Sequence, residues 1–153
     1  PANGSEPAHL KAVPYTLPAK TDRKQRTIYT LSMPVSSGDH PPVILQPETK
    51  IRVRGRIASS HRIWFGMTLR RENGDFAGRF QTILPAEEFK SGEPFEVVLN
   101  LSDYHLDPSL AQWAESLPKA PYDLIVQNVW CHTLWDPAGL QVSEIELMIP
   151  TEK

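Results

Sequence analysis

Arginine and tryptophan side chains between residues 52 and 79 are the groups in this chain best suited to chemistry. Seven of the nine arginines fall in this stretch, where they alternate with apolar residues over 51–57 and 62–70. A period of two is typical of β-strands with one buried and one exposed face. Guanidinium groups pair with carboxylate or sulfate and supply fixed donors, and an indole stacks on the CH-rich face of a sugar. This chemistry is recognition, with no obvious means of breaking a bond.

A ligand surface follows if the apolar residues of both segments point inward, because the arginines and Trp64 then face solvent. If the two strands are neighbours in one sheet, guanidinium groups lie close to Trp64. Trp135 joins the set because Trp135-Asp136-Pro137 is typical of a loop at the rim of a sheet. The predicted ligand-binding residues are Trp64, Trp135, Arg54, Arg56, Arg70, Arg79 and Gln81.

Other uses of the arginines stay open at this point. They can pair with Asp and Glu side chains across the sheet, or stack on Trp64, and then serve stability alone. The same surface can also be a protein interface. Exposed ion pairs contribute little to stability, so the presence of acidic neighbours does not decide between these uses.

Catalytic and metal motifs do not occur in the sequence. It contains no G-x-S-x-G, no H-E-x-x-H and no glycine-rich phosphate loop, and its five histidines show no two-histidine metal spacing. The adjacent acids Glu87 and Glu88, and the nearby Glu72 and Asp75, are typical of solvated turns rather than of carboxylates facing each other across a cleft. We therefore expect no enzymatic activity, no catalytic residue and no cofactor.

Length and composition fit one ordinary soluble domain. The chain has 153 residues, 40% hydrophobic content and a net charge of -2, which argues against a nucleic-acid partner chosen by bulk charge. Its apolar runs are too short to span a membrane, and its single cysteine excludes an internal disulfide. Proline-rich residues 1–25 indicate a linker or N-terminal extension, although their apolar residues could also lie against the domain predicted for 26–150.

Short alternating segments dominate the rest of the chain and predict an all-β fold, a two-sheet antiparallel β-sandwich. The expected strands are 27–35, 43–46, 50–59, 61–71, 78–84, 94–101, 122–133 and 140–149. Asn73-Gly74 predicts a hairpin turn, and 108–117 predicts one short helix capped by Asp107. The predicted core comprises Ile51, Val53, Ile57, Ile63, Phe65, Met67, Leu69, Phe80, Leu84, Phe95, Val97, Leu99, Ile145 and Leu147.

The sequence does not decide which side chains of the strand 122–133 point inward, because two alternation phases fit it. Either Leu124, Val126 and Trp130 or Ile125, Val129 and Cys131 point inward. Tryptophan at such a position is more often a core residue, so we expect Trp130 in the core and Cys131 as a small buried side chain.

Three segments, in order, resemble the galactose-binding-like jelly rolls found among carbohydrate-binding modules. They are 49–57, an entering strand; 94–104, an apolar strand followed by Leu-Ser-Asp-Tyr; and 137–147, a closing strand. The resemblance covers roughly residues 27–149. It implies a jelly-roll, non-catalytic module that binds an acidic or polar glycan, often at rim loops such as that of Trp135. It also implies an extracytoplasmic place (secreted, periplasmic or cell-surface) within a larger parent polypeptide.

The closing strand carries the one departure from the family pattern. Related modules often have an acidic pair there and many hold a structural calcium, whereas this chain has Ser143-Glu144. If a structural calcium is bound as in related modules, Glu144 and Glu146 would be its ligands, with one carboxylate fewer than the pattern. A protein-interaction or structural β-sandwich domain of a larger envelope-associated protein is the alternative function, and a jelly-roll enzyme with two convergent carboxylates is a third.

Overall fold

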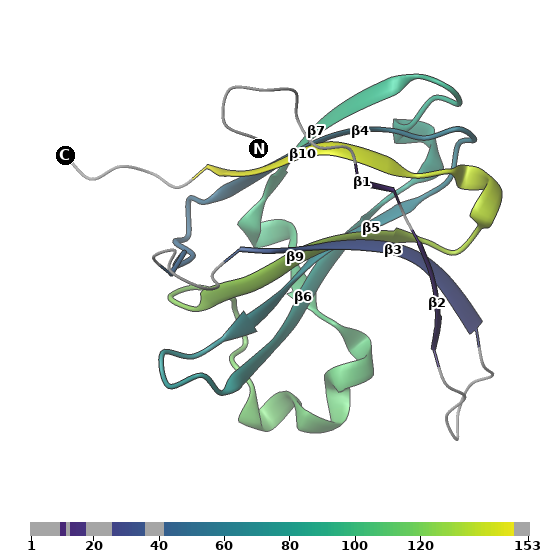
Figure 1. Ribbon diagram of the computed structural model, residues 1–153. Coiled ribbons are helices and arrows are strands. Elements are labelled where there is room, and N and C mark those ends of the chain that lie inside the picture. Colours follow the sequence, from purple (N-terminus) through teal and green to yellow (C-terminus); the bar gives the residue numbers. More distant parts are fainter. Residues whose placement is uncertain (1–9, 12, 18–25, 36–41, 149–153) are drawn as a thin grey trace.

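Two antiparallel β-sheets lie face to face in the computed structural model (Figure 1), which describes residues 10–11, 13–17, 26–35 and 42–148. The four-stranded sheet has the order β1 (Leu10–Lys11), β10 (Gln141–Met148), β4 (Lys50–Arg56), β7 (Pro94–Asn100). The six-stranded sheet has the order β2 (Val13–Leu17), β3 (Arg26–Pro34), β9 (Ile125–Thr133), β5 (Ile63–Arg70), β6 (Phe76–Leu84), β8 (His105–Leu106). The predicted all-β antiparallel sandwich is confirmed, and jelly-roll connectivity stays a prediction.

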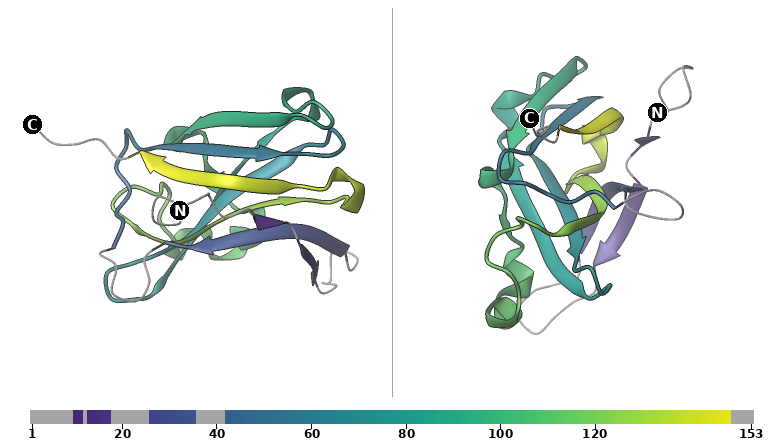
Figure 2. Two further views of the ribbon diagram at one scale, coloured as in Figure 1. Left: turned by 45° about the horizontal axis from the view of Figure 1, so that its top comes forward. Right: turned by 90° about the vertical axis from the view of Figure 1, so that its left-hand side faces the viewer.

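Helical structure in the described residues is limited to short 3₁₀ segments. These are η1 (Ala86–Glu88), η2 (Leu101–Asp103), η3 (Pro108–Ser116) and η4 (Asp136–Ala138). The helix predicted over 108–117 corresponds to η3, and its expected cap is present, because Asp107 Oδ1 accepts a hydrogen bond from the Ser109 amide at 2.9 Å. The right-hand view of Figure 2 shows η3 at the lower edge of the molecule.

The N-terminal segment differs in part from the predicted linker. Leu10–Lys11 pairs with β10 and Val13–Leu17 pairs with β3, so these residues extend one edge of each sheet. For residues 10–11 and 13–17, the alternative that the N-terminal segment lies against the domain is therefore correct. The remainder of the predicted linker, residues 1–9, 12 and 18–25, lies outside the described residues.

Alternation along the strands builds the core as the sequence predicts. Ile63, Phe65, Met67 and Leu69 are almost fully buried, while Trp64 between them is partly exposed. Burying each such large apolar side chain contributes about 1.5–3 kcal/mol. Every residue of the predicted core is either buried or packs partly buried against the core cluster. The prediction that the apolar side chains of β5 point into the core and Trp64 points outward is thus confirmed.

Sheet membership separates two strands that follow one another in the sequence. β4 pairs with β10 and β7, whereas β5 pairs with β6 and β9 in the opposite sheet. The condition that these strands are neighbours is therefore not met. Arg54 and Arg56 belong to one layer of the sandwich and Trp64, Arg70 and Arg79 to the other.

A register shift in β9 overturns the expectation that Trp130 lies in the core. Thr68 is opposite Asn128 and Leu69 is opposite Val126, so Gln127 is an extra residue in β9. The extra residue changes the alternation phase along the strand. Val126 is therefore buried before the shift and Val129 and Cys131 after it, and Trp130 is left partly exposed.

Candidate ligand-binding site

Ion pairs occupy the outer face of the four-stranded sheet. Arg54 lies 3.5 Å from Glu96 and 3.3 Å from Glu144, measured from guanidinium nitrogen to carboxylate oxygen. Arg52 contacts the same two glutamates and makes its shortest contact with Glu146. Two arginines thus meet three glutamates contributed by both neighbouring strands. These contacts favour the alternative that Arg54 pairs with acidic side chains across the sheet over the prediction that it binds a ligand.

The other predicted residues of this sheet also have partners within the chain. Arg56 donates a hydrogen bond to the Gly92 carbonyl at 2.6 Å. Glu144 and Glu146, the expected calcium ligands, are the acids that pair with Arg52 and Arg54. Across the described residues, no group of three or more His, Cys, Asp or Glu side chains could hold a metal ion.

Two tryptophans and a histidine stack on the outer face of the six-stranded sheet. We call Trp64, His132 and Trp130 the aromatic platform. The His132 ring centroid lies 5.1 Å from that of Trp64 and 5.4 Å from that of Trp130, with interplanar angles of 17° and 10°. The Arg62 guanidinium lies 4.9 Å from the Trp64 ring centroid. The three platform residues are partly exposed, so part of the indole surface of Trp64 and Trp130 is accessible from solvent.

Strand register explains how the platform forms. Trp64 of β5 is directly opposite His132 of β9, and Trp130 precedes His132 by two residues, so all three side chains share a face. Gly66 is directly opposite Trp130. A β-carbon on Gly66 would lie 2.3 Å from two carbons of the Trp130 ring, so the absence of a side chain there gives the indole its place.

Hydrogen-bonding side chains surround the platform on the same face. Thr68 and Gln81 face outward on β5 and β6, and Asn128 lies opposite Thr68 on β9. Asn128 donates to the Ser32 hydroxyl at 2.7 Å, while its Oδ1 is buried and has no partner among the described residues. Fixed donors and acceptors beside stacked rings are what recognition of a polyhydroxylated ligand needs.

The two predicted arginines of this sheet, Arg79 and Arg70, differ in their contacts. The guanidinium of Arg79 lies 3.2 Å from Asp107 and also reaches Ser109 at 3.4 Å. Arg70 is partly exposed on the same outer face, opposite Phe76. Of the predicted ligand residues, the structure therefore gathers Trp64, Arg70, Arg79 and Gln81 on one surface and leaves Arg54 and Arg56 on the opposite one.

Trp135 lies at the rim, as predicted, and is 45% exposed. Its ring stacks on His61, with ring centroids 6.1 Å apart. The loops that carry these rings are joined by the hydrogen bond from the Ala58 amide to the Ala138 carbonyl at 2.7 Å. Trp135 is thus a separate aromatic position beside the end of the sheet that bears Trp64.

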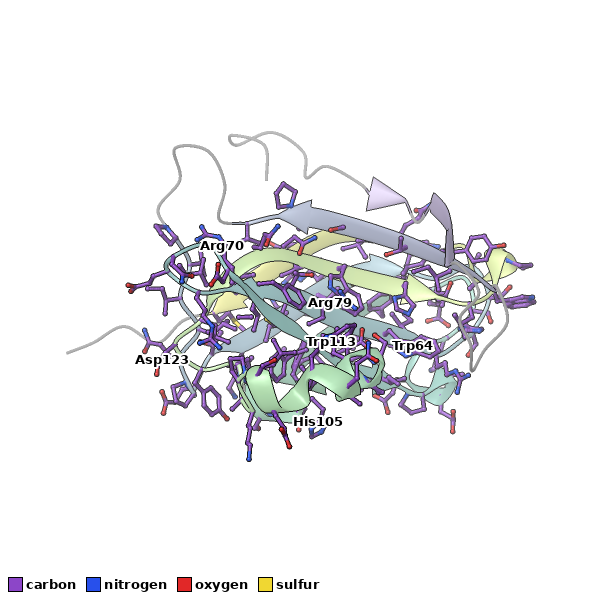
Figure 3. All side chains as sticks on the ribbon, turned by 90° about the horizontal axis from the view of Figure 1, so that it is seen from below. Trp64, Arg70, Arg79, His105, Trp113 and Asp123 are labelled. Atoms are coloured by element: carbon purple, nitrogen blue, oxygen red, sulfur yellow. The ribbon has the colours of Figure 1, made fainter. Side chains whose placement is uncertain are left out.

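Exposed apolar side chains lie on the same side of the molecule. Phe76 and Ile83 of β6 and Trp113 of η3 are between 44% and 49% exposed. The view from below shows Trp113, Arg79 and Trp64 all within the outline of the six-stranded sheet (Figure 3). This face is therefore richer in unburied aromatic and apolar groups than the paired face of the opposite sheet.

Titratable groups beneath the platform are held neutral. Burial raises the pKa of the Cys131 thiol from 9.0 to about 12. Burial, with smaller effects of Cys131 and Asp103, also raises the pKa of Tyr104 well above 10.0. Cys131 is thus the small buried residue that the sequence predicts, rather than a nucleophile.

Sequence reasoning missed Trp130, His132 and Gly66 as parts of this surface. The signal was present, because Trp130-Cys131-His132-Thr133 alternates, and Cys131 and Thr133 are the buried members. Choosing that phase would have placed Trp130 and His132 outward. No pattern in the sequence indicated that both lie beside Trp64, since that depends on which strands pair.

Comparisons of the chain with protein families, with curated proteins and with solved structures found no match. In the described part of the chain, no helix combines the length and the apolar character needed to cross a bilayer.

Proposed function

We propose that this protein is a non-catalytic carbohydrate-binding module whose ligand lies on the outer face of the six-stranded sheet. The observation that carries the proposal is the stack of Trp64, His132 and Trp130 beside outward-facing Thr68 and Gln81. Aromatic faces bind the CH-rich faces of pyranose rings, and amide and hydroxyl groups bind their hydroxyls. The resemblance to galactose-binding-like jelly rolls supports the same function.

The ligand on this surface is a polar glycan without acidic groups. An acidic ligand needs unpaired guanidinium groups, but Arg54 pairs with two glutamates and Arg79 with Asp107. Arg62 and Arg70 remain and can donate to hydroxyls as well as to anions. The module acts within a larger, extracytoplasmic polypeptide, where neighbouring domains raise a weak affinity through avidity.

A glycan array with neutral, amino-bearing and acidic glycans tests this function. Wild-type protein should retain neutral glycans, and Trp64→Ala and Trp130→Ala should each lose most of that signal. Val98→Ala is the matched control, because Val98 is 51% exposed on the opposite sheet. Absence of any glycan signal for the folded wild type, or equal losses in Val98→Ala, would refute the proposal.

A protein-interaction or structural domain is the second candidate, and the exposure of Phe76, Ile83 and Trp113 favours it. This function requires no sugar affinity. It predicts that no glycan on the array binds and that polar substitution of Ile83 or Trp113 leaves stability unchanged. The array therefore separates the two candidates.

A further inference from the structure

A groove runs along the free edge of β6, beside the aromatic platform and outside it. Its volume is about 500 Å³, within the ~300–1,000 Å³ typical of small-ligand sites. Leu84, Leu99 and Leu106 supply apolar lining, and Gln81, Asp103 and His105 supply polar groups. A mostly apolar wall with a few converging polar groups is the usual composition of a site for a small polar molecule.

The groove exists because β8 is shorter than the strand that it accompanies. β8 pairs only with Phe80 and Gln81, so among the described residues β6 has no strand partner on this side beyond Gln81. The turn that leads into β8 is anchored by Leu101 and Tyr104, both buried in the core. Asp103 and His105 are therefore held in place beside the groove while they remain exposed.

Strand register connects the groove to the platform. Trp130, Gly66, Gln81 and His105 are successive cross-strand partners on β9, β5, β6 and β8. Direct partners in antiparallel strands point to the same face. The row therefore crosses the sheet at right angles to the strands over three strand spacings, about 14 Å. An oligosaccharide, but not a single sugar, can reach from the platform to the groove.

Charge indicates the class of sugar that enters. The Asp103 carboxylate forms no hydrogen bond or ion pair with any other described residue, so it is available to a ligand. A carboxylate accepts hydrogen bonds from hydroxyl or ammonium groups and repels carboxylate and sulfate groups. The groove therefore suits a sugar without an acidic substituent.

We propose that this groove is a second subsite that holds a neutral or amino-bearing sugar unit of an oligosaccharide whose other units stack on the aromatic platform. Asp103 accepts hydrogen bonds from adjacent hydroxyls or from an ammonium group, and the leucine side chains contact the ring. The inference rests on the proposed function and names the ligand class of the same surface.

Calorimetric titration of the full chain with oligosaccharides of increasing length tests the subsite. The probes are cello-, xylo- and chito-oligosaccharides, deacetylated chito-oligosaccharides and oligogalacturonides. Asp103→Asn should bind the longer neutral probes about 10-fold more weakly than wild type while disaccharide binding is unchanged. Any preference for deacetylated over acetylated chito-oligosaccharides should disappear in Asp103→Asn. Glu72→Gln, which alters an exposed acid at the far hairpin, should behave as wild type.

The outcomes separate the subsite from the proposed function. If Asp103→Asn matches wild type at every length while Trp64→Ala binds weakly, the groove is not a subsite and the platform still binds glycan. Tightest binding of oligogalacturonides would overturn the ligand class. If folded wild type binds none of the probes, both proposals fail.

Discussion

The indole of Trp130 lies directly over Gly66, where a β-carbon would come within 2.3 Å of two ring carbons. This relationship joins β9 to β5 on the outer face of the six-stranded sheet, and it holds Trp130 in its stack with His132. A glycine inside a strand usually weakens it, so the position has a specific use. Here that use is to make room for an aromatic ring.

Gly66→Ala should destabilise the protein by about 1–3 kcal/mol, because the added methyl group forces the indole out of its place. Urea denaturation measures this free energy of unfolding. In a Trp130→Ala background the clash is absent, so adding Gly66→Ala should cost much less there. Equal costs in the two backgrounds would show that the ring contact is not what requires glycine.

Arg54→Ala should leave glycan binding unchanged, because Arg54 lies on the four-stranded sheet and is paired with Glu96 and Glu144. Its cost in stability should stay below about 1 kcal/mol, as is usual for a solvent-screened ion pair, and added salt should reduce that cost. Denaturation at low and high salt and glycan titration measure the two effects. If Arg54→Ala lost glycan binding, the ligand would lie on the four-stranded sheet, and our assignment to the six-stranded sheet would be wrong.

Asp107→Ala should destabilise the protein by about 1 kcal/mol through loss of the cap on η3. The same change leaves Arg79 without its ion-pair partner. Asp107→Asn is the matched control, since an amide oxygen can still accept the hydrogen bond from Ser109. If both variants were as stable as wild type, the capping interaction would contribute nothing measurable.

Alkaline pH should destabilise the fold through Cys131, whose pKa burial raises from 9.0 to about 12. Between these values the unfolded chain loses a thiol proton that the folded chain retains, so the free energy of unfolding falls as pH rises. The contribution of the neutral thiol is fully present below pH 9.0. In Cys131→Ala the decline over this range should be smaller, as measured by denaturation at several pH values. An identical pH dependence in both proteins would contradict the assignment.

Alternation let the sequence predict which side chains of β4, β5 and β6 face the core. That property depends on each strand alone, so the sequence is enough to assign Phe65 and Met67 inward and Trp64 outward. Local patterns also predict the two-sheet sandwich, from the many short alternating segments, and η3, from Asp107 and Pro108 at its start.

Pairing between strands could not be predicted, because it depends on residues far apart in the sequence. β4 and β5 follow one another yet lie in different sheets, which separates Arg54 and Arg56 from Trp64. The extra residue Gln127 likewise becomes visible only when β9 is aligned with β5, and it turns Trp130 outward. The sequence thus indicates which side chains of β5 and β6 face outward, whereas the position of His132 between the two tryptophans depends on how the strands pair.

The most direct test of the binding face is a titration followed through the tryptophan indole N–H signals in two-dimensional NMR. The chain has four tryptophans, at 64, 113, 130 and 135, so four signals report on separate positions. With a bound neutral oligosaccharide, our account predicts that the signals of Trp64 and Trp130 shift most strongly. Unmoved signals of both residues, with shifts confined to backbone amides of β4, β7 and β10, would contradict it.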